Sequence, residues 1–103
     1  MRYHKFANVA SVKQTITTSA VNLKALLVAS GEDSSKMNSW SAIEFSTEGD
    51  IRYLCNGNIP TPTIGLALAT GQTRLIRGEN INNIWVVSQA GSVDIQVQAG
   101  ETN

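Results

Sequence analysis

With 103 residues, the chain is long enough for one domain with a single modest hydrophobic core. Its eight basic and eight acidic residues cancel, so it offers no broad positive field, and we expect neither nucleic acid nor a membrane as a partner. Only 16% of its residues are charged, whereas Ser, Thr, Asn and Gln make up 33 of the 103. Such a surface belongs either to an ordinary Thr-rich β protein with Asn-rich turns or to one that is covered by protein partners.

The first ten residues precede any clear strand pattern, and we interpret residues 1–10 as an N-terminal arm ahead of one domain at 11–103. The arm mixes cations with aromatic rings in Arg2, Tyr3, His4, Lys5 and Phe6. Such a mixture also occurs where bases stack on rings beside phosphate-binding charges. Zero net charge favours a protein-docking arm instead, in which Tyr3 and Phe6 anchor and Arg2 and Lys5 steer the encounter.

The charges are unevenly distributed along the chain. Residues 1–31 contain four basic residues and no acid, whereas residues 32–103 contain four basic and eight acidic residues. A basic N-terminal part on an acidic body could bind an acidic neighbour, including another copy of the chain. In so small a sample, chance explains the asymmetry equally well.

A strand and a short helix are predicted next along the chain. Residues 11–18 are Thr-rich and strand-like. Residues 22–31 predict a helix of about two turns, because Asn22 can cap its start and Gly31 can end it. The leucines at 23, 26 and 27 share one face of this helix, which we expect to be buried.

A polar loop at 32–38 separates this helix from a series of short strands. Residues 40–45 return to a strand pattern, with Ile43 and Phe45 on one face, and glycines recur 6–13 residues apart from Gly57 to Gly100. That spacing is typical of turns between the strands of sandwiches and barrels. The strands expected between these turns are Ile51–Cys55, Leu66–Leu68, Thr73–Ile76, Ile84–Val87 and Val93–Val97, the last placing Val93, Ile95 and Val97 on one face.

The connections between these strands also have recognisable chemistry. Asn56-Gly57 tolerates positive φ, Gln89–Ser92 predicts a hairpin joining the last two strands, and Glu48–Asp50 predicts a solvated hairpin turn. Pro60 and Pro62 make the segment Ile59–Thr63 an irregular connection or an edge. We therefore expect an all-β fold, a small antiparallel β-sandwich or jelly-roll-like barrel with one short helix near residues 22–30.

Residues for catalysis or cofactor binding are scarce. The one histidine, His4, lies in the presumed arm, and the one cysteine, Cys55, lies in a strand where a thiol is usually a small buried hydrophobe. The acidic pairs at 32–33 and 48–50 lack the spacing of an EF-hand, and no phosphate-binding glycine motif occurs. We expect no catalytic residue, no metal site and no cofactor, and hence no enzyme.

The two tryptophans leave an alternative open. Trp40 and Trp85 each sit in an apolar run, where a core role is the more common one. They could instead form a platform for sugar rings. Exposure of either indole beside Asn or Asp side chains would favour that second interpretation.

Residues 12–99 resemble small virion structural proteins of tailed bacteriophages. The resemblance rests on Ile51-Arg52-Tyr53, followed by Asn56-Gly57 and Pro60-Thr61, then by Gly65 with Leu68 and a closing segment from Gly91 to Val97. The helix at 22–31 also fits. Asn56 stands where Asp is expected before the glycine, which keeps the turn but removes a charge.

This resemblance implies a β-sandwich that is part of a virion, made in the host cytoplasm. Its implied role is that of a head decoration or cement protein that bridges neighbouring major capsid subunits and stabilises the shell. The expected partners are the major capsid protein, copies of the chain itself, or both. The alternatives are a tail or head-fibre module that binds host-surface glycan, and an unrelated soluble β domain or enzyme subunit.

Overall fold

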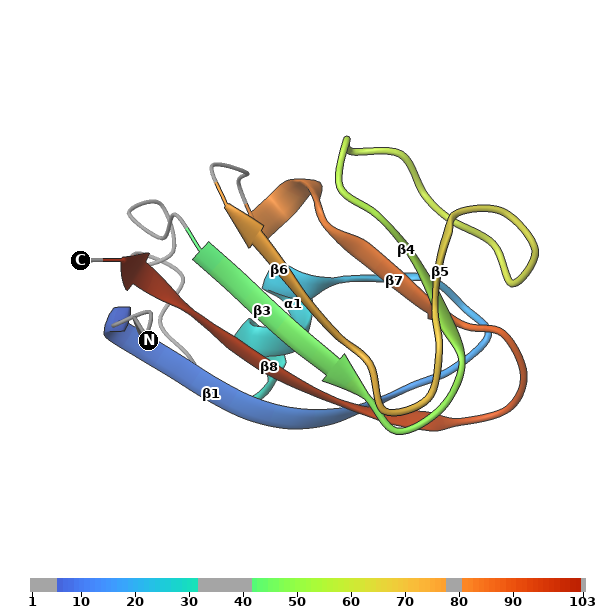
Figure 1. The fold of residues 1–103 in the computed structure, drawn as a ribbon, viewed down its shortest axis with the longest axis horizontal. Coiled ribbons are helices and arrows are strands. Elements are labelled where there is room, and N and C mark those ends of the chain that lie inside the picture. The colour runs from blue at the N-terminus through green and yellow to red at the C-terminus, as the bar shows by residue number, and fades with distance from the viewer. Residues whose placement is uncertain (1–5, 32–41, 78–80, 103) are drawn as a thin grey trace.

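In the residues that the computed structural model describes, 6–31, 42–77 and 81–102, eight strands form two four-stranded antiparallel sheets. Sheet A has the order β1-β8-β3-β6 and sheet B the order β2-β7-β4-β5 (Figure 1). The strands of sheet A are β1 (Phe6–Ile16), β8 (Val93–Thr102), β3 (Ala42–Thr47) and β6 (Thr73–Arg77). The strands of sheet B are β2 (Val21–Asn22), β7 (Trp85–Ser88), β4 (Ile51–Leu54) and β5 (Leu66–Leu68). The helical segments are α1 (Leu23–Ala29) and the 3₁₀ turn η2 (Ile81–Asn83).

The path of the chain is that of a jelly roll. Of the connections between consecutive strands, only β4 to β5 stays within one sheet, and every other one crosses between the sheets. Eight antiparallel strands arranged in two sheets in this way are the jelly-roll form of the β-sandwich. The predicted fold class, an all-β sandwich or jelly-roll-like barrel with one short helix, is confirmed.

Two predicted hairpins are wrong. The turn Gln89–Ser92 leads from β7 in sheet B to β8 in sheet A, and Glu48–Asp50 leads from β3 in sheet A to β4 in sheet B. Hydrogen bonds from Gln89 explain where the first turn lies, since its backbone N–H donates to the Asp50 carbonyl (3.1 Å) and its Nε2 donates to the Ile51 carbonyl (3.1 Å). The turn is therefore held beside β4 and carries the chain across the end of the sandwich.

Alternating side chains of both sheets fill the space between them. Ile43 and Phe45 of β3 and Ile95 and Val97 of β8 are buried, as the alternation predicts, and they meet Ile51, Tyr53 and Val86 from sheet B. Phe45 and Tyr53 contact edge to face, with ring centroids 5.3 Å apart and planes at 79°. Burying each such side chain contributes about 1.5–3 kcal/mol. The interior is thus a packed core.

Strand β1 begins earlier than the sequence suggests. The prediction placed the first strand at 11–18, but β1 starts at Phe6 and pairs with β8 from Phe6↔Thr102 to Ile16↔Val93, with a register shift between Ala7 and Ala10. Residues 6–10 of the predicted arm therefore lie in sheet A. Arg2, Tyr3, His4 and Lys5 lie outside the described residues, as do Trp40 and the predicted loop 32–38.

Helix α1 confirms its prediction in detail. The Asn22 side-chain oxygen accepts hydrogen bonds from the backbone N–H groups of Lys24 (2.9 Å) and Ala25 (3.3 Å). Leu23, Leu26 and Leu27 are buried in the core, and Gly31 has a φ of 102° after the last turn. The amide nitrogen of Asn22 also donates to the Asn82 carbonyl (2.5 Å), so one side chain caps α1 and joins it to η2.

The variant Asn22→Ala should lower the free energy of unfolding by about 1–2 kcal/mol, because it removes both the cap and the link to η2. Urea denaturation followed by circular dichroism measures this change. Asn22→Ser is the matched control, since its hydroxyl restores the cap but not the link, and it should recover part of the loss. Equal stability of the wild type and Asn22→Ala would contradict the assigned double role.

Candidate functional site

Several ionisable side chains of the described residues make contacts within the domain. Asp50 accepts hydrogen bonds from the backbone N–H (3.0 Å) and hydroxyl (3.1 Å) of Thr70. Lys13 lies 3.2 Å from a carboxylate oxygen of Glu48 and 3.9 Å from one of Asp94. Part of the basic N-terminal region thus faces acidic residues of the same chain.

The described part of the chain contains no group of three or more His, Cys, Asp and Glu side chains that could hold a metal ion. Cys55 is partly buried and packs against the core, as predicted. Within the same residues, no helix is both long and apolar enough to cross a membrane.

The connection from β4 to β5 presents an apolar surface, which we call the apolar loop (residues 58–66). Four large hydrophobic residues are exposed in the described chain, and three of them lie here: Ile59 (61% exposed), Ile64 (62%) and Leu66 (54%). No charged residue occurs between Arg52 and Arg74. Figure 1 shows the loop projecting at the end of the sandwich opposite the start of β1 and the end of β8.

The apolar loop is irregular, as predicted for Ile59–Thr63, yet it is firmly held. Arg52 donates from Nε to the Pro62 carbonyl (3.1 Å) and from a terminal guanidinium nitrogen to the Gly65 carbonyl (2.9 Å). Thr61 and Ile64 exchange two backbone hydrogen bonds of 2.9 and 3.1 Å. The exposed isoleucines are therefore presented in a fixed arrangement, and little conformational freedom is lost when a partner covers them.

A second surface feature, the helix groove, lies between α1, η2 and the start of β7. It is an open hollow of about 680 Å³, lined among others by Lys24, Ala25, Val28, Ala29, Asn82 and Trp85. Trp85 is half-buried. Because Val86 points into the core, its neighbour Trp85 points to the outer face of sheet B. Trp85 thus belongs neither to the core nor to the exposed large hydrophobic residues, and it lines the groove together with Asn22, Asn82 and Asn83.

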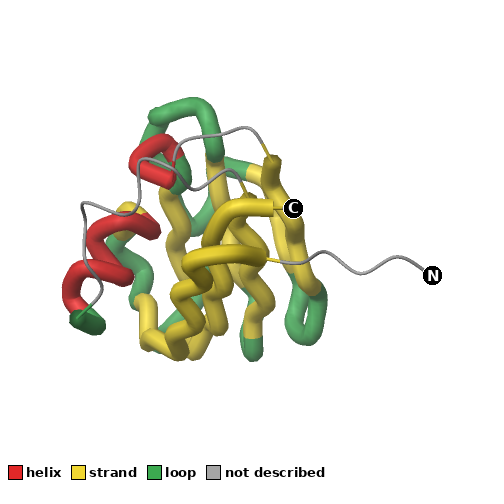
Figure 2. Tube along the Cα trace, turned by 90° about the vertical axis from the view of Figure 1, so that its left-hand side faces the viewer, coloured by secondary structure: helices red, strands yellow, loops and turns green. Residues whose placement is uncertain are grey.

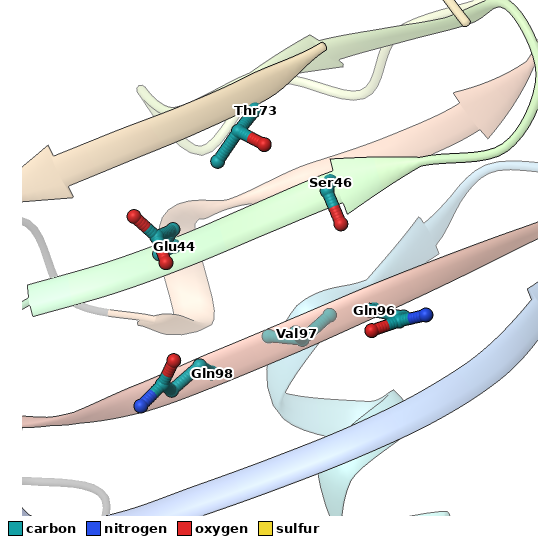
Figure 3. A pocket seen from close by; sticks show the side chains of 6 residues that line it. All are labelled: Glu44, Ser46, Thr73, Gln96, Val97 and Gln98. Carbon is teal, nitrogen blue, oxygen red and sulfur yellow. The ribbon is translucent and has the colours of Figure 1, made fainter. Parts of the chain in front are cut away.

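The outer face of sheet A has a smaller polar hollow (Figure 3). It measures about 120 Å³ and is lined by Glu44, Ser46, Thr73, Gln96, Val97 and Gln98 from β3, β6 and β8. Its lining contains one carboxylate and no aromatic ring, and its volume suits a few water molecules. We regard it as a hydrated part of the sheet surface.

No family model matches the chain, and no curated protein matches it significantly. Among solved structures, a de novo designed double-stranded β-helix aligns with 87% of this chain and 97% of its own, at a TM-score of 0.50 and 13% identity. The Schizosaccharomyces pombe Cnp3 cupin domain aligns with 96% of this chain and 59% of its own, at 0.53 and 9%. At such low identity, both likenesses show the jelly-roll fold alone.

A viral coat protein also aligns with the chain, but distantly. The tobacco streak virus coat protein matches 96% of this chain and 90% of its own, with a TM-score of 0.39 and 12% identity. A score this low carries no argument about fold or function.

The surfaces on the described residues differ from the predicted site. The sequence analysis predicts a docking site in the arm at residues 2–6. The exposed apolar side chains of the described chain instead lie mainly at 59–66. One signal could have indicated them: two isolated isoleucines occur around Pro60 and Pro62, in a segment that prolines exclude from a central strand and that carries no charge.

The variant Gly65→Ala should unfold more readily than Gly71→Ala. Both glycines have positive φ (134° and 82°), which disfavours any Cβ, but a Cβ at Gly65 would also lie 3.1 Å from the Pro60 Cβ and 3.3 Å from the Tyr53 carbonyl oxygen. Nothing lies within 4 Å of a Cβ at Gly71. We expect losses of about 1 kcal/mol for Gly71→Ala and a further ~1–3 kcal/mol for Gly65→Ala, measured by urea denaturation. Equal losses would show that the loop is not packed as described.

Proposed function

We propose that this chain is a non-enzymatic structural protein of a virus particle, a capsid decoration protein that bridges neighbouring major capsid subunits. The observation that carries the proposal is the apolar loop, a fixed surface with Ile59, Ile64 and Leu66 exposed. Exposed apolar patches on soluble domains commonly mark surfaces that are covered by a partner. The resemblance of residues 12–99 to phage virion proteins supports the choice of a particle as the partner.

The packing of the domain also suits a structural role. The two sheets enclose a densely packed core, and such interiors have low compressibility. The hydrogen bonds of Arg52 tie the loop to β4, which pairs with both β5 and β7. A force between two capsid subunits that acts on the apolar loop would therefore be passed directly to sheet B.

A modest contact is sufficient for this function. A shell carries many equivalent sites, and a protein that touches two neighbouring subunits gains from effective concentration as well as from the strength of each contact. Residues 2–6 would supply the second contact, on the shell or on another copy of the chain. The proposed partners are therefore the major capsid protein and further copies of this protein.

The variant Ile64→Asp should bind undecorated capsids at least about tenfold more weakly than the wild type, because it places a charge at the centre of an apolar contact. Ile64 is 62% exposed, so the fold should be unaffected. Gln96→Asp, a change at another exposed position on the outer face of sheet A, is the control and should bind normally. Co-sedimentation with capsids measures both, and wild-type binding by Ile64→Asp would refute docking through the loop.

Removal of residues 1–5 tests the arm separately. Since β1 begins at Phe6, this deletion leaves every described strand intact, and the melting temperature should be close to that of the full chain. We expect weaker incorporation into particles, measured by quantitative gel analysis of purified virions. Unchanged incorporation would restrict docking to the apolar loop and remove the arm from the proposal.

A further inference from the structure

The helix groove is formed by the outward sides of elements whose inward sides build the core. Leu23, Leu26 and Leu27 of α1 are buried, whereas Ala25, Val28 and Ala29 of the same helix line the groove. Figure 2 shows α1 and η2 next to each other at one side of the sandwich. The backbone N–H of Leu23 donates to the Ile84 carbonyl (2.9 Å), which fixes the start of α1 beside β7.

The groove is an open hollow with a mainly apolar lining. Its volume, about 680 Å³, lies within the range of about 300–1,000 Å³ typical of small-molecule sites, which combine an apolar lining with a few polar groups. The indole of Trp85 is partly exposed and is the one aromatic ring among the lining residues. An indole with one open face can stack against the apolar face of a sugar ring.

The polar groups around the indole are amides and one ammonium. Asn22, Asn82 and Asn83 line the groove and give it a polar wall beside the indole. The Asn22 amide is engaged in the cap of α1 and in the link to η2. The hydrogen bond from Asn22 to the Asn82 carbonyl holds η2 at this place. Among the described residues that line the groove, Lys24 is the one that carries a charge, and its ammonium complements an anion.

We propose that the helix groove binds an acidic carbohydrate, with the sugar ring against Trp85 and a carboxylate or phosphate near the Lys24 ammonium. The site is distinct from the apolar loop, and it would let a particle-borne protein contact a glycan-coated surface. This inference does not require the proposed docking to a capsid.

The test is an NMR titration of the full chain with glucose, glucuronate and glucose 6-phosphate. We expect millimolar binding, with shifts confined to the Trp85 indole and to the amides of Lys24, Ala25 and Asn82. At least one of the two anionic sugars should bind about fivefold more tightly than glucose, the effect of one partly exposed ion pair. The stronger of the two anions identifies the acidic group that the site prefers.

Two variants distinguish the contribution of the Trp85 ring to binding from that of the Lys24 charge. Trp85→Ala should weaken all three sugars at least about tenfold. Since this change could also disturb the fold, Lys24→Gln is the second variant: it should keep glucose binding and abolish the preference for the anionic sugars. Lys13→Gln, a matched change on the outer face of sheet A, should keep both.

Three results would overturn the proposal. The first is the absence of groove shifts with every sugar, and the second is an unchanged anion preference in Lys24→Gln. The third is a set of groove shifts that follow protein concentration instead of sugar, which would mean that a second copy of the chain covers the groove. The docking experiment with Ile64→Asp is unaffected by any of these, so the two proposals fail or survive separately.

Discussion

The contact between Phe45 and Tyr53 joins the two sheets at the centre of the core, and the rest of the structure depends on the alternation that brings these rings together. With ring centroids 5.3 Å apart and both side chains buried, the sheets are held at a fixed separation. A one-residue slip of β3 or β4 would turn one ring to solvent and a polar neighbour into the core. The register of both sheets is therefore set by burial, and side chains fill the space between the sheets.

The same alternation produces the outer surfaces. On β4, Ile51 and Tyr53 point inward, so Arg52 points outward and holds the apolar loop through two carbonyl groups. On β7, Val86 points inward and Trp85 faces the helix groove. Each candidate surface thus lies on the outer side of an element whose inner side is packed in the core.

Sequence reasoning succeeded where the deciding interactions are local. Asn22 and the three leucines specify α1, and the alternation of Val93, Ile95 and Val97 specifies β8. It failed where partners distant in sequence decide the structure. Gln89–Ser92 has the chemistry of a hairpin turn, and nothing within those four residues tells whether the chain stays in one sheet or crosses to the other.

The same difference between local and distant interactions explains which parts of the candidate site the sequence predicts. The start of β1 depends on the far end of β8, since the segment from Phe6 to Ala10 has no clear alternation and is paired across a register shift. Because the sequence alone does not show the pairing with β8, the pattern of this segment predicts an arm. The exposure of Ile59 and Ile64 depends on the hydrogen bonds from Arg52 to the loop backbone. The residues next to these isoleucines in the sequence give no sign of those hydrogen bonds. Trp85 needed its inward neighbour Val86 to settle which way the indole points.

The antiparallel pairing of Phe6 with Thr102 brings the two ends of the described chain to one place on sheet A. The apolar loop lies at the opposite end of the sandwich (Figure 1). A peptide fused directly to Phe6 or to Thr102 would consequently start at the end of the sandwich away from the apolar loop, and a short linker between these two residues would close the described strands into a ring. Cargo carried beyond Thr102 would therefore leave the apolar loop free to dock.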